Sequence, residues 1–68
     1  MLMPERIGHR IQQIRKKKSL SQEDLAEKAN LNSTYLGHIE QGRREPRFKT
    51  LKKIAAALNV MVKDLIPF

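Results

Sequence analysis

Apolar residues recur at helical spacing along this sequence, and no stretch alternates between apolar and polar positions as a strand does. Ile7, Ile11 and Ile14 lie at i, i+4 and i+7, so they form one apolar stripe on a first helix. Five short helices are predicted, over about residues 4–17, 21–30, 33–41, 48–58 and 61–65. The core face expected of the fourth helix comprises Phe48, Leu51, Ile54, Ala55 and Leu58.

Capping residues mark the ends of these helices. Ser21, followed three positions later by Asp24, is close to a capping box and predicts the start of the second helix. Asn30 and Asn59 suit the left-handed conformation that ends a helix, and Asn32 is a good N-cap for the third helix. The sequence therefore predicts an all-α fold, a compact five-helix bundle.

Length and composition narrow the possible functions. The 68 residues predict a single small domain over 1–68, with no room for a deep catalytic pocket. Cysteine is absent, so thiolate metal sites and cysteine nucleophiles are excluded. No apolar run reaches the length of a membrane span, and the N-terminus has no signal-peptide core. We expect a soluble, cytoplasmic protein with no cofactor, no metal and no membrane contact.

The charge balance indicates a polyanionic partner. Fourteen Lys and Arg against seven Asp and Glu leave a net charge of +7, and a domain this basic typically binds nucleic acid or an anionic membrane surface. The first helix is basic and amphipathic, but its apolar stripe is needed to close the core. One Tyr and two Phe are too few for the base-stacking mode of single-strand binders.

The second and third predicted helices are joined by a very short connection, which is typical of a helix-turn-helix unit over about residues 21–41. Ala26 lies where the two helices are expected to cross. A larger side chain there would overpack the crossing and cost about 1–3 kcal/mol.

Two motifs carry a family resemblance. LSQEDLA at 20–26 and YLGHIEQG at 35–42, followed by Pro46, closely resemble the Cro/C1-type helix-turn-helix family, also called the XRE family. The resemblance covers about residues 6–66. It implies a five-helix, lambda-repressor-like domain of transcriptional regulators that binds double-stranded DNA, usually as a dimer.

The resemblance also implies which residues meet the DNA. The third helix, over 33–41, is similar to the family's recognition helix, which lies in the major groove. It holds no Lys or Arg although basic segments flank it, so base reading and phosphate binding would fall to different residues. Base contacts are expected from Ser33, Thr34 and His38. Phosphate contacts are expected from Gln22, Asn32, Tyr35, Arg43, Arg44, Arg47 and Lys49.

Some of these roles have structural alternatives. Gln22 stands at a helix N-terminus, which is an anion site, but its side chain can instead extend the capping network. His38 can be a solvated side chain on an exposed helix face. The Tyr35 ring can pack at the edge of the core with its hydroxyl in water, and the arginines of 43–47 can form a solvated face.

Five further positions extend or break the family pattern. Arg15 and Glu40 match positions that form a partly buried ion pair between the first and third helices in several members. Gly37 costs about 1 kcal/mol inside a helix, either for a close approach to DNA or as a tolerated defect. Arg47 and Met61 stand where Ser or Thr usually caps a helix, which predicts ragged starts for the last two helices.

Apolar residues at the C-terminus exceed what the core can hold. An exposed apolar cluster marks an interface, so we expect a homodimer through the fifth helix and the tail. A tail folded back over its own core is the alternative. The expected interface residues are Val60, Met61, Val62, Ile66 and Phe68.

The sequence predicts a sequence-specific transcriptional regulator that binds a pseudo-palindromic operator as a dimer, and not an enzyme. His9 and His38 lie on different helices, without paired carboxylates or a Gly-rich phosphate loop. The alternative is an antitoxin or bridging module that holds a protein partner, a toxin or another regulator, and binds DNA secondarily. In size the chain resembles controllers of restriction–modification systems, phage repressors and antitoxins alike.

Overall fold

The computed structural model describes residues 4–66, which form four α-helices and one short 3-10 helix and, within that range, no strand. The elements are α1 (Pro4–Lys17), α2 (Gln22–Ala29), α3 (Ser33–Glu40), α4 (Phe48–Leu58) and η1 (Val62–Leu65). The first four predicted helices are confirmed, with ends that differ by a residue.

The predicted fifth α-helix is wrong, because η1 is a single 3-10 turn of four residues. The main-chain N–H of Ile66 donates to the Lys63 carbonyl, three residues back, at 3.3 Å. A segment of this length offers little room for the i to i+4 ladder of an α-helix, and the tighter i to i+3 bond closes it instead.

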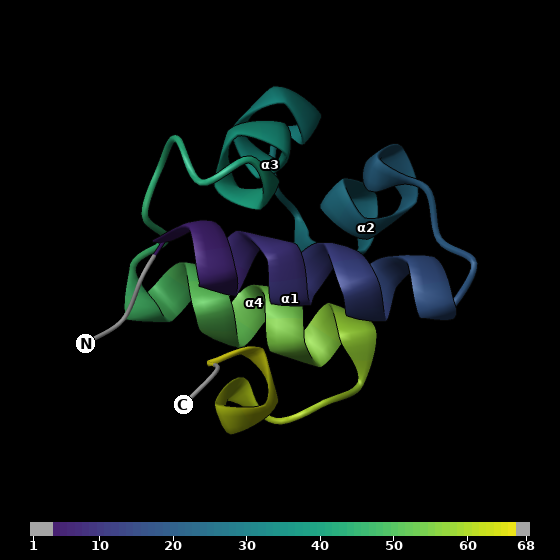
Figure 1. Ribbon diagram of the computed structural model, residues 1–68. Helices are drawn as coiled ribbons and strands as arrows, with labels where there is room; N and C mark the ends of the chain where they lie inside the picture. The colour runs from purple at the N-terminus through teal and green to yellow at the C-terminus, as the bar shows by residue number, and fades with distance from the viewer. Residues whose placement is uncertain (1–3, 67–68) are drawn as a thin grey trace.

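The elements are arranged around α1 and α4. Figure 1 shows α2 and α3 on one side of the molecule and η1 on the opposite side, with α1 and α4 running between them. α3 packs against α1 and α2, and α2 also packs against α4, while η1 contacts α4 and α1. The α2–α3 pair therefore packs against α1 and α4 on its inner side and leaves its outer side open.

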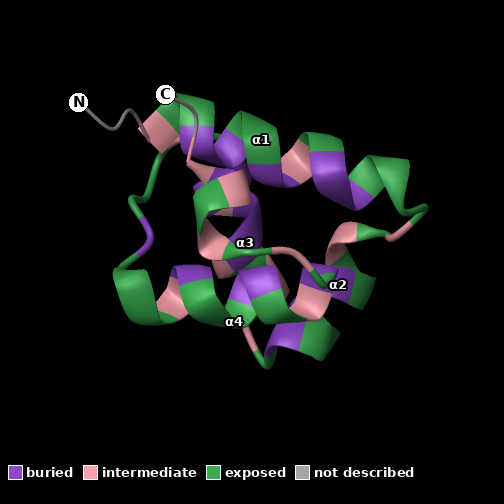
Figure 2. Ribbon diagram, turned by 90° about the horizontal axis from the view of Figure 1, so that it is seen from below, coloured by how far each residue is buried: buried purple, intermediate pink, exposed green. Residues whose placement is uncertain are grey.

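The core forms where the apolar stripes of the helices meet, and Figure 2 shows the buried stretches of α1 and α4 turned towards the interior. Phe48 is a correction to the predicted core, because its side chain is 64% exposed. Phe48 is the first residue of α4, and helical side chains lean towards the N-terminus, so its ring extends past the end of the packed stripe. The buried apolar residues are Ile7, Ile11, Ile14, Leu25, Ala26, Ala29, Leu36, Ile39, Leu51, Ile54, Ala55, Leu58 and Leu65.

The predicted caps account for most helix ends. The Ser21 hydroxyl accepts from the Asp24 main-chain N–H at 2.9 Å, and the Asp24 carboxylate accepts from the Ser21 N–H at 2.9 Å, which completes a capping box. Asn30 and Asn59 end α2 and α4 with φ of 56° and 59°. Arg47 gives α4 no side-chain cap.

The start of η1 is less ragged than predicted. The Asp64 carboxylate accepts from the Met61 main-chain N–H at 2.9 Å, so one of the two hydrogen bonds of a capping box is present even though Met61 has no polar side chain.

α1 and α3 approach each other closely at Gly8, which is buried on α1. A Cβ atom at this position would lie 2.7 Å from the Glu40 carbonyl oxygen and would also collide with the Ile39 carbonyl. These carbonyls belong to the last turn of α3. The absence of a side chain at Gly8 therefore sets how closely α1 can approach the C-terminal end of α3.

Candidate DNA-binding surface

The α2–α3 pair has the geometry of a helix-turn-helix unit. Ala26 is buried, with 3% of its surface exposed, and its carbonyl accepts from the Leu31 main-chain N–H at 2.8 Å across the turn. The Asn32 side-chain oxygen then accepts from the N–H groups of Thr34 and Tyr35 at 2.8 and 3.1 Å, as predicted for an N-cap. Local hydrogen bonds thus fix the angle at which α3 leaves the turn.

The outer side of α3 carries the three residues proposed to read bases. Thr34 is exposed, and Ser33 and His38 are half-buried. Thr34 and His38 are four residues apart, so they share one face of the helix. The helix contains no Lys or Arg and no acid in its first turn, so it presents a neutral polar surface.

A basic loop over residues 41–47 follows directly from α3. Its arginines 43, 44 and 47 are exposed, as is Lys49 in the first turn of α4. The main-chain N–H groups of Arg43 and Arg44 donate to the His38 carbonyl at 2.9 and 3.3 Å, so the start of the loop is tied to α3. Pro46 is buried and anchors the other end. The three arginines therefore lie next to the neutral surface of α3 on a loop held at both ends, and Lys49 lies just beyond this loop in α4.

Tyr35 lies between the core and this loop. Its side chain is half-buried and packs against the core, which agrees with the structural alternative for its ring. The Arg44 guanidinium carbon lies 5.8 Å from the centre of the ring. Sequence reasoning treated Tyr35 and Arg44 separately and missed this contact, because nine positions and a change of element separate them.

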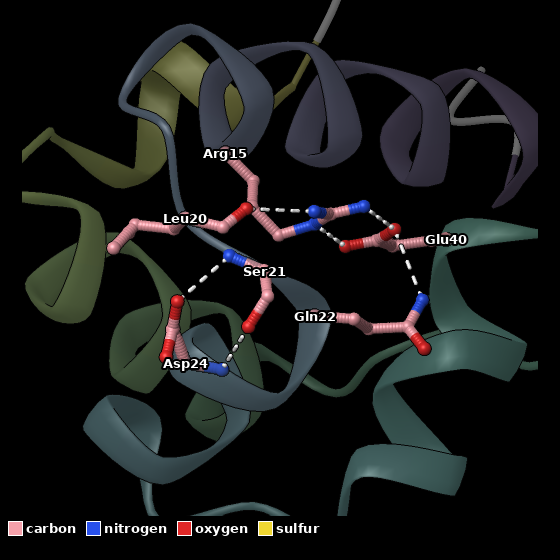
Figure 3. A network of polar contacts seen from close by, with 6 residues as sticks. All are labelled: Arg15, Leu20, Ser21, Gln22, Asp24 and Glu40. Carbon is pink, nitrogen blue, oxygen red and sulfur yellow. Dashed lines mark hydrogen bonds and ion pairs between the residues drawn. The ribbon is translucent and has the colours of Figure 1, made fainter.

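Arg15 and Glu40 form an ion pair between α1 and α3 (Figure 3). Arg15 donates from Nε to Glu40 Oε2 at 2.7 Å and from Nη2 to Oε1 at 3.0 Å, and the two side chains are 9% and 1% exposed. The hydrogen bond with Glu40 raises the pKa of Arg15 above its ordinary value, against the opposing effect of burial. The third guanidinium nitrogen, Nη1, donates to the Leu20 carbonyl at 2.8 Å. The pair therefore ties α3 to α1 and to the segment that precedes α2.

Gln22 joins this network rather than the capping box. Its amide nitrogen donates to Glu40 Oε1 at 3.2 Å, and Figure 3 shows its side chain reaching from the start of α2 towards α3. Gly37 leaves space for the amide, because a Cβ atom there would lie 3.1 Å from Gln22 Oε1. Gly37 thus serves contact between the two helices, a role that the sequence analysis did not consider.

The C-terminal apolar set divides in two. Met61 is 65% exposed, whereas Val60, Val62 and Ile66 are half-buried and pack against the core. Phe68 lies outside the described residues. Arg10 on α1 donates from Nε to the Asp64 carbonyl at 2.9 Å and so fastens η1 to α1.

Within residues 4–66, no three His, Cys, Asp or Glu side chains come together in a way that could hold a metal ion. Nor does any helix in that range combine the length and apolar character needed to cross a membrane. An open hollow along α1 is lined by Arg10, Gln13, Ile14, Lys16 and Lys17. None of these side chains carries a carboxylate, an imidazole or a hydroxyl group.

Comparison with known proteins agrees with this geometry. A protein-family model described as "Helix-turn-helix" matches residues 11–65. The immunity repressor protein of Bacillus phage phi105 is 45% identical over 60 residues, which are 88% of this chain and 42% of the repressor. The structure of the restriction-modification controller protein C.AhdI from Aeromonas hydrophila has a TM-score of 0.90 at 34% identity, covering 91% of this chain and 94% of that one.

A third similar protein was solved with DNA. The structure of SinR, a master regulator for biofilm formation, in complex with DNA has a TM-score of 0.83 at 43% identity and covers 87% of this chain and 95% of that one. The chain spans less than half the length of the phage repressor but nearly all of the controller protein. These relatives are regulators and not enzymes. The chain belongs to the Cro/C1-type, or XRE, helix-turn-helix family of DNA-binding transcription regulators.

Proposed function

We propose that this chain acts as a sequence-specific regulator of transcription that binds double-stranded DNA through α3 in the major groove. The observation that carries the proposal is the outer side of the α2–α3 unit, where a neutral polar helix face is bordered by a fixed basic loop. Groove-reading helices need short polar side chains that reach base edges, and the cations beside them neutralise the phosphates on either side.

The proposed division of roles follows from position and charge. The side chains of Ser33, Thr34 and His38 read base edges, and the Thr34 methyl group can pack on a thymine methyl. Hydroxyl groups discriminate only weakly between bases. We therefore expect contacts with the DNA phosphates to supply much of the affinity. The phosphate contacts proposed are Gln22, Asn32, Tyr35, Arg43, Arg44, Arg47 and Lys49.

Gln22 can make its phosphate contact without leaving the network. Its Nε2 carries two hydrogens, and the bond to Glu40 uses one of them. The second stays available at the N-terminus of α2, where the main-chain N–H groups and the helix dipole also favour an anion. Glu40 is 1% exposed in its side chain and is paired with Arg15, so its negative charge offers little repulsion to DNA.

A dimer that reads two half-sites completes the proposal. One short recognition helix contacts too few base pairs to select a site in a genome, and two-fold dimers place two such helices about 34–36 Å apart. Met61, exposed next to η1, supports a contact surface at the end of the chain opposite α3. We place the protein in the cytoplasm as a single domain that takes up residues 1–68.

The test starts from a random pool of duplexes, because the operator is not known in advance. Selection on the full chain should converge on a sequence with two-fold symmetry, and affinity for it should fall steeply with salt. The matched competitor is the same duplex with one half-site scrambled. Recovery of no preferred sequence, or equal binding to the scrambled duplex, would contradict sequence-specific dimeric recognition.

A further inference from the structure

The contact between Tyr35 and Arg44 joins a fixed ring to an exposed side chain. The guanidinium carbon lies 5.8 Å from the ring centre, within the distance of about 6 Å at which a cation is attracted to an aromatic face. Tyr35 is the fixed partner, because its ring packs against the core and its main-chain N–H is held by the Asn32 cap. Arg44 is exposed and lies on the loop.

Arg44 is also held at its backbone. Its main-chain N–H donates to the His38 carbonyl at 3.3 Å, so both ends of the residue are attached to α3. In the part of the chain that the structure describes, Arg43 and Arg47 have no aromatic ring beneath them. Arg44 is therefore distinguished among the loop arginines by its contact with an aromatic ring of α3.

We propose that Tyr35 is a positioning residue for DNA binding, whose ring holds the Arg44 guanidinium beside α3 in the orientation that meets a phosphate at the groove edge. The proposal rests on the proposed function and deepens it. An arginine that is ordered before binding loses less conformational freedom in the complex, so the Tyr35 ring strengthens binding through Arg44, in addition to any phosphate bond that the Tyr35 hydroxyl makes. The ring, and not the hydroxyl, then carries the main contribution of Tyr35.

The first test needs no DNA. The sequence has one tyrosine, no tryptophan and two phenylalanines, so NMR of the free protein can measure the ring-current shift of the Arg44 side-chain protons, and substitution of each ring shows which one causes it. Tyr35→Leu should abolish the shift and Tyr35→Phe should keep it. Phe48→Leu is the matched control, because it removes the ring of the Lys52–Phe48 pair, also at 5.8 Å, and should leave Arg44 unchanged.

Arg44→Ala supplies an independent measurement if Tyr35→Leu does not fold. Arg44 is exposed, so its removal leaves the core intact. It should uncover the ring and increase acrylamide quenching of the single tyrosine. Arg44 protons that do not shift in a folded Tyr35→Leu protein, or unchanged quenching in Arg44→Ala, would overturn the proposal.

The second test measures affinity for the selected duplex. Tyr35→Leu should weaken binding about two- to fivefold, the range that an exposed cation–aromatic contact supplies, and Tyr35→Phe should stay within about twofold of the parent. In the Arg44→Ala background, Tyr35→Leu should have no further effect. Equal losses in Tyr35→Phe and Tyr35→Leu would show that the hydroxyl, and not the ring, accounts for the contribution of Tyr35. Additive losses would show that the two residues act independently, and either result refutes positioning.

The two proposals can fail separately. If the parent chain binds no duplex, the proposed function is wrong, and the free-protein measurements still decide whether Tyr35 orders Arg44. If the parent binds and the two losses add, only the positioning role is wrong.

Discussion

Removing Arg15 from its ion pair should destabilise the fold strongly. Arg15 supplies two of the three hydrogen bonds that the Glu40 carboxylate accepts, and the Glu40 side chain is 1% exposed. Arg15→Met therefore leaves a buried negative charge whose remaining partner is the Gln22 amide. The expected cost is about 3–5 kcal/mol. A domain of 68 residues has a total unfolding free energy of about 3–10 kcal/mol, so this loss removes a large share of it.

The partner substitution should cost less, and the double substitution less than the sum. In Glu40→Leu the guanidinium keeps its bond to the Leu20 carbonyl, and its long stem lets it move towards water. In Arg15→Met/Glu40→Leu no buried charge remains, and replacing such a pair by apolar side chains is often neutral or stabilising. The order of stability is therefore expected to be the double variant first, then Glu40→Leu, then Arg15→Met.

Urea denaturation followed by far-UV circular dichroism measures these differences. The slope for a domain this small is about 1 kcal/mol per M, so each kcal/mol lost moves the midpoint by about 1 M. Trimethylamine N-oxide brings the transition of weak variants into range. Arg6→Met is the control, since it removes an exposed cation from the same helix and should change stability by no more than about 0.5 kcal/mol. Single losses that add in the double variant to within about 0.5 kcal/mol would refute the reasoning.

Four further results are expected. Replacing the three loop arginines 43, 44 and 47 with alanine should reduce the slope of log affinity against log salt by about 2.7, measured by fluorescence anisotropy on specific and random duplexes, and an unchanged slope would remove the loop from the interface. His38→Ala should change the preference between operator variants by about 1–3 kcal/mol and leave binding to random duplex nearly unchanged, so a uniform loss would make His38 a backbone contact. Met61→Lys should shift the free protein from dimer to monomer in sedimentation at micromolar concentration, and an unchanged sedimentation coefficient would move the interface elsewhere. Asp24 has its pKa held below its ordinary value of 3.8 by hydrogen bonds from the Ser21 main chain and hydroxyl, so its contribution to stability is present above that pH and is lost as the pH falls through the lower value. The stability difference between the parent and Asp24→Asn should then narrow in acid urea titrations, and a difference that is constant with pH would contradict the capping role.

Helix ends were predictable because they depend on neighbouring residues. Ser21, Asn30, Asn32 and Asn59 each adopt the cap that their side chains favour, and no distant contact is needed to explain them. The division between a neutral recognition helix and a basic loop was likewise visible in the order of charges. Both features depend only on residues that lie within a few positions of one another in the sequence.

What the sequence concealed depends on residues brought together by folding. The apolar spacing of α4 includes Phe48, but spacing does not tell where the core ends along the helix axis. In the sequence, Gly8 and Gly37 are only glycines that lower helix stability. Their role in close helix contacts becomes visible once the helices that they face are known. The bond from Gln22 to Glu40 spans 18 positions, and either residue alone had a simpler reading as a DNA contact or a structural acid.

α1 has a consequence for how such a protein measures the separation of its half-sites. At Gly8 it touches the end of α3, and two residues later Arg10 bonds to the Asp64 carbonyl in η1. A single turn of α1 thus sets the distance between α3, which we propose reads the DNA groove, and η1, which we propose faces the partner subunit. Changes in that turn would alter the operator spacing that a dimer tolerates while both contact surfaces keep their chemistry. Spacing preference and base preference can therefore diverge independently among chains that share this architecture.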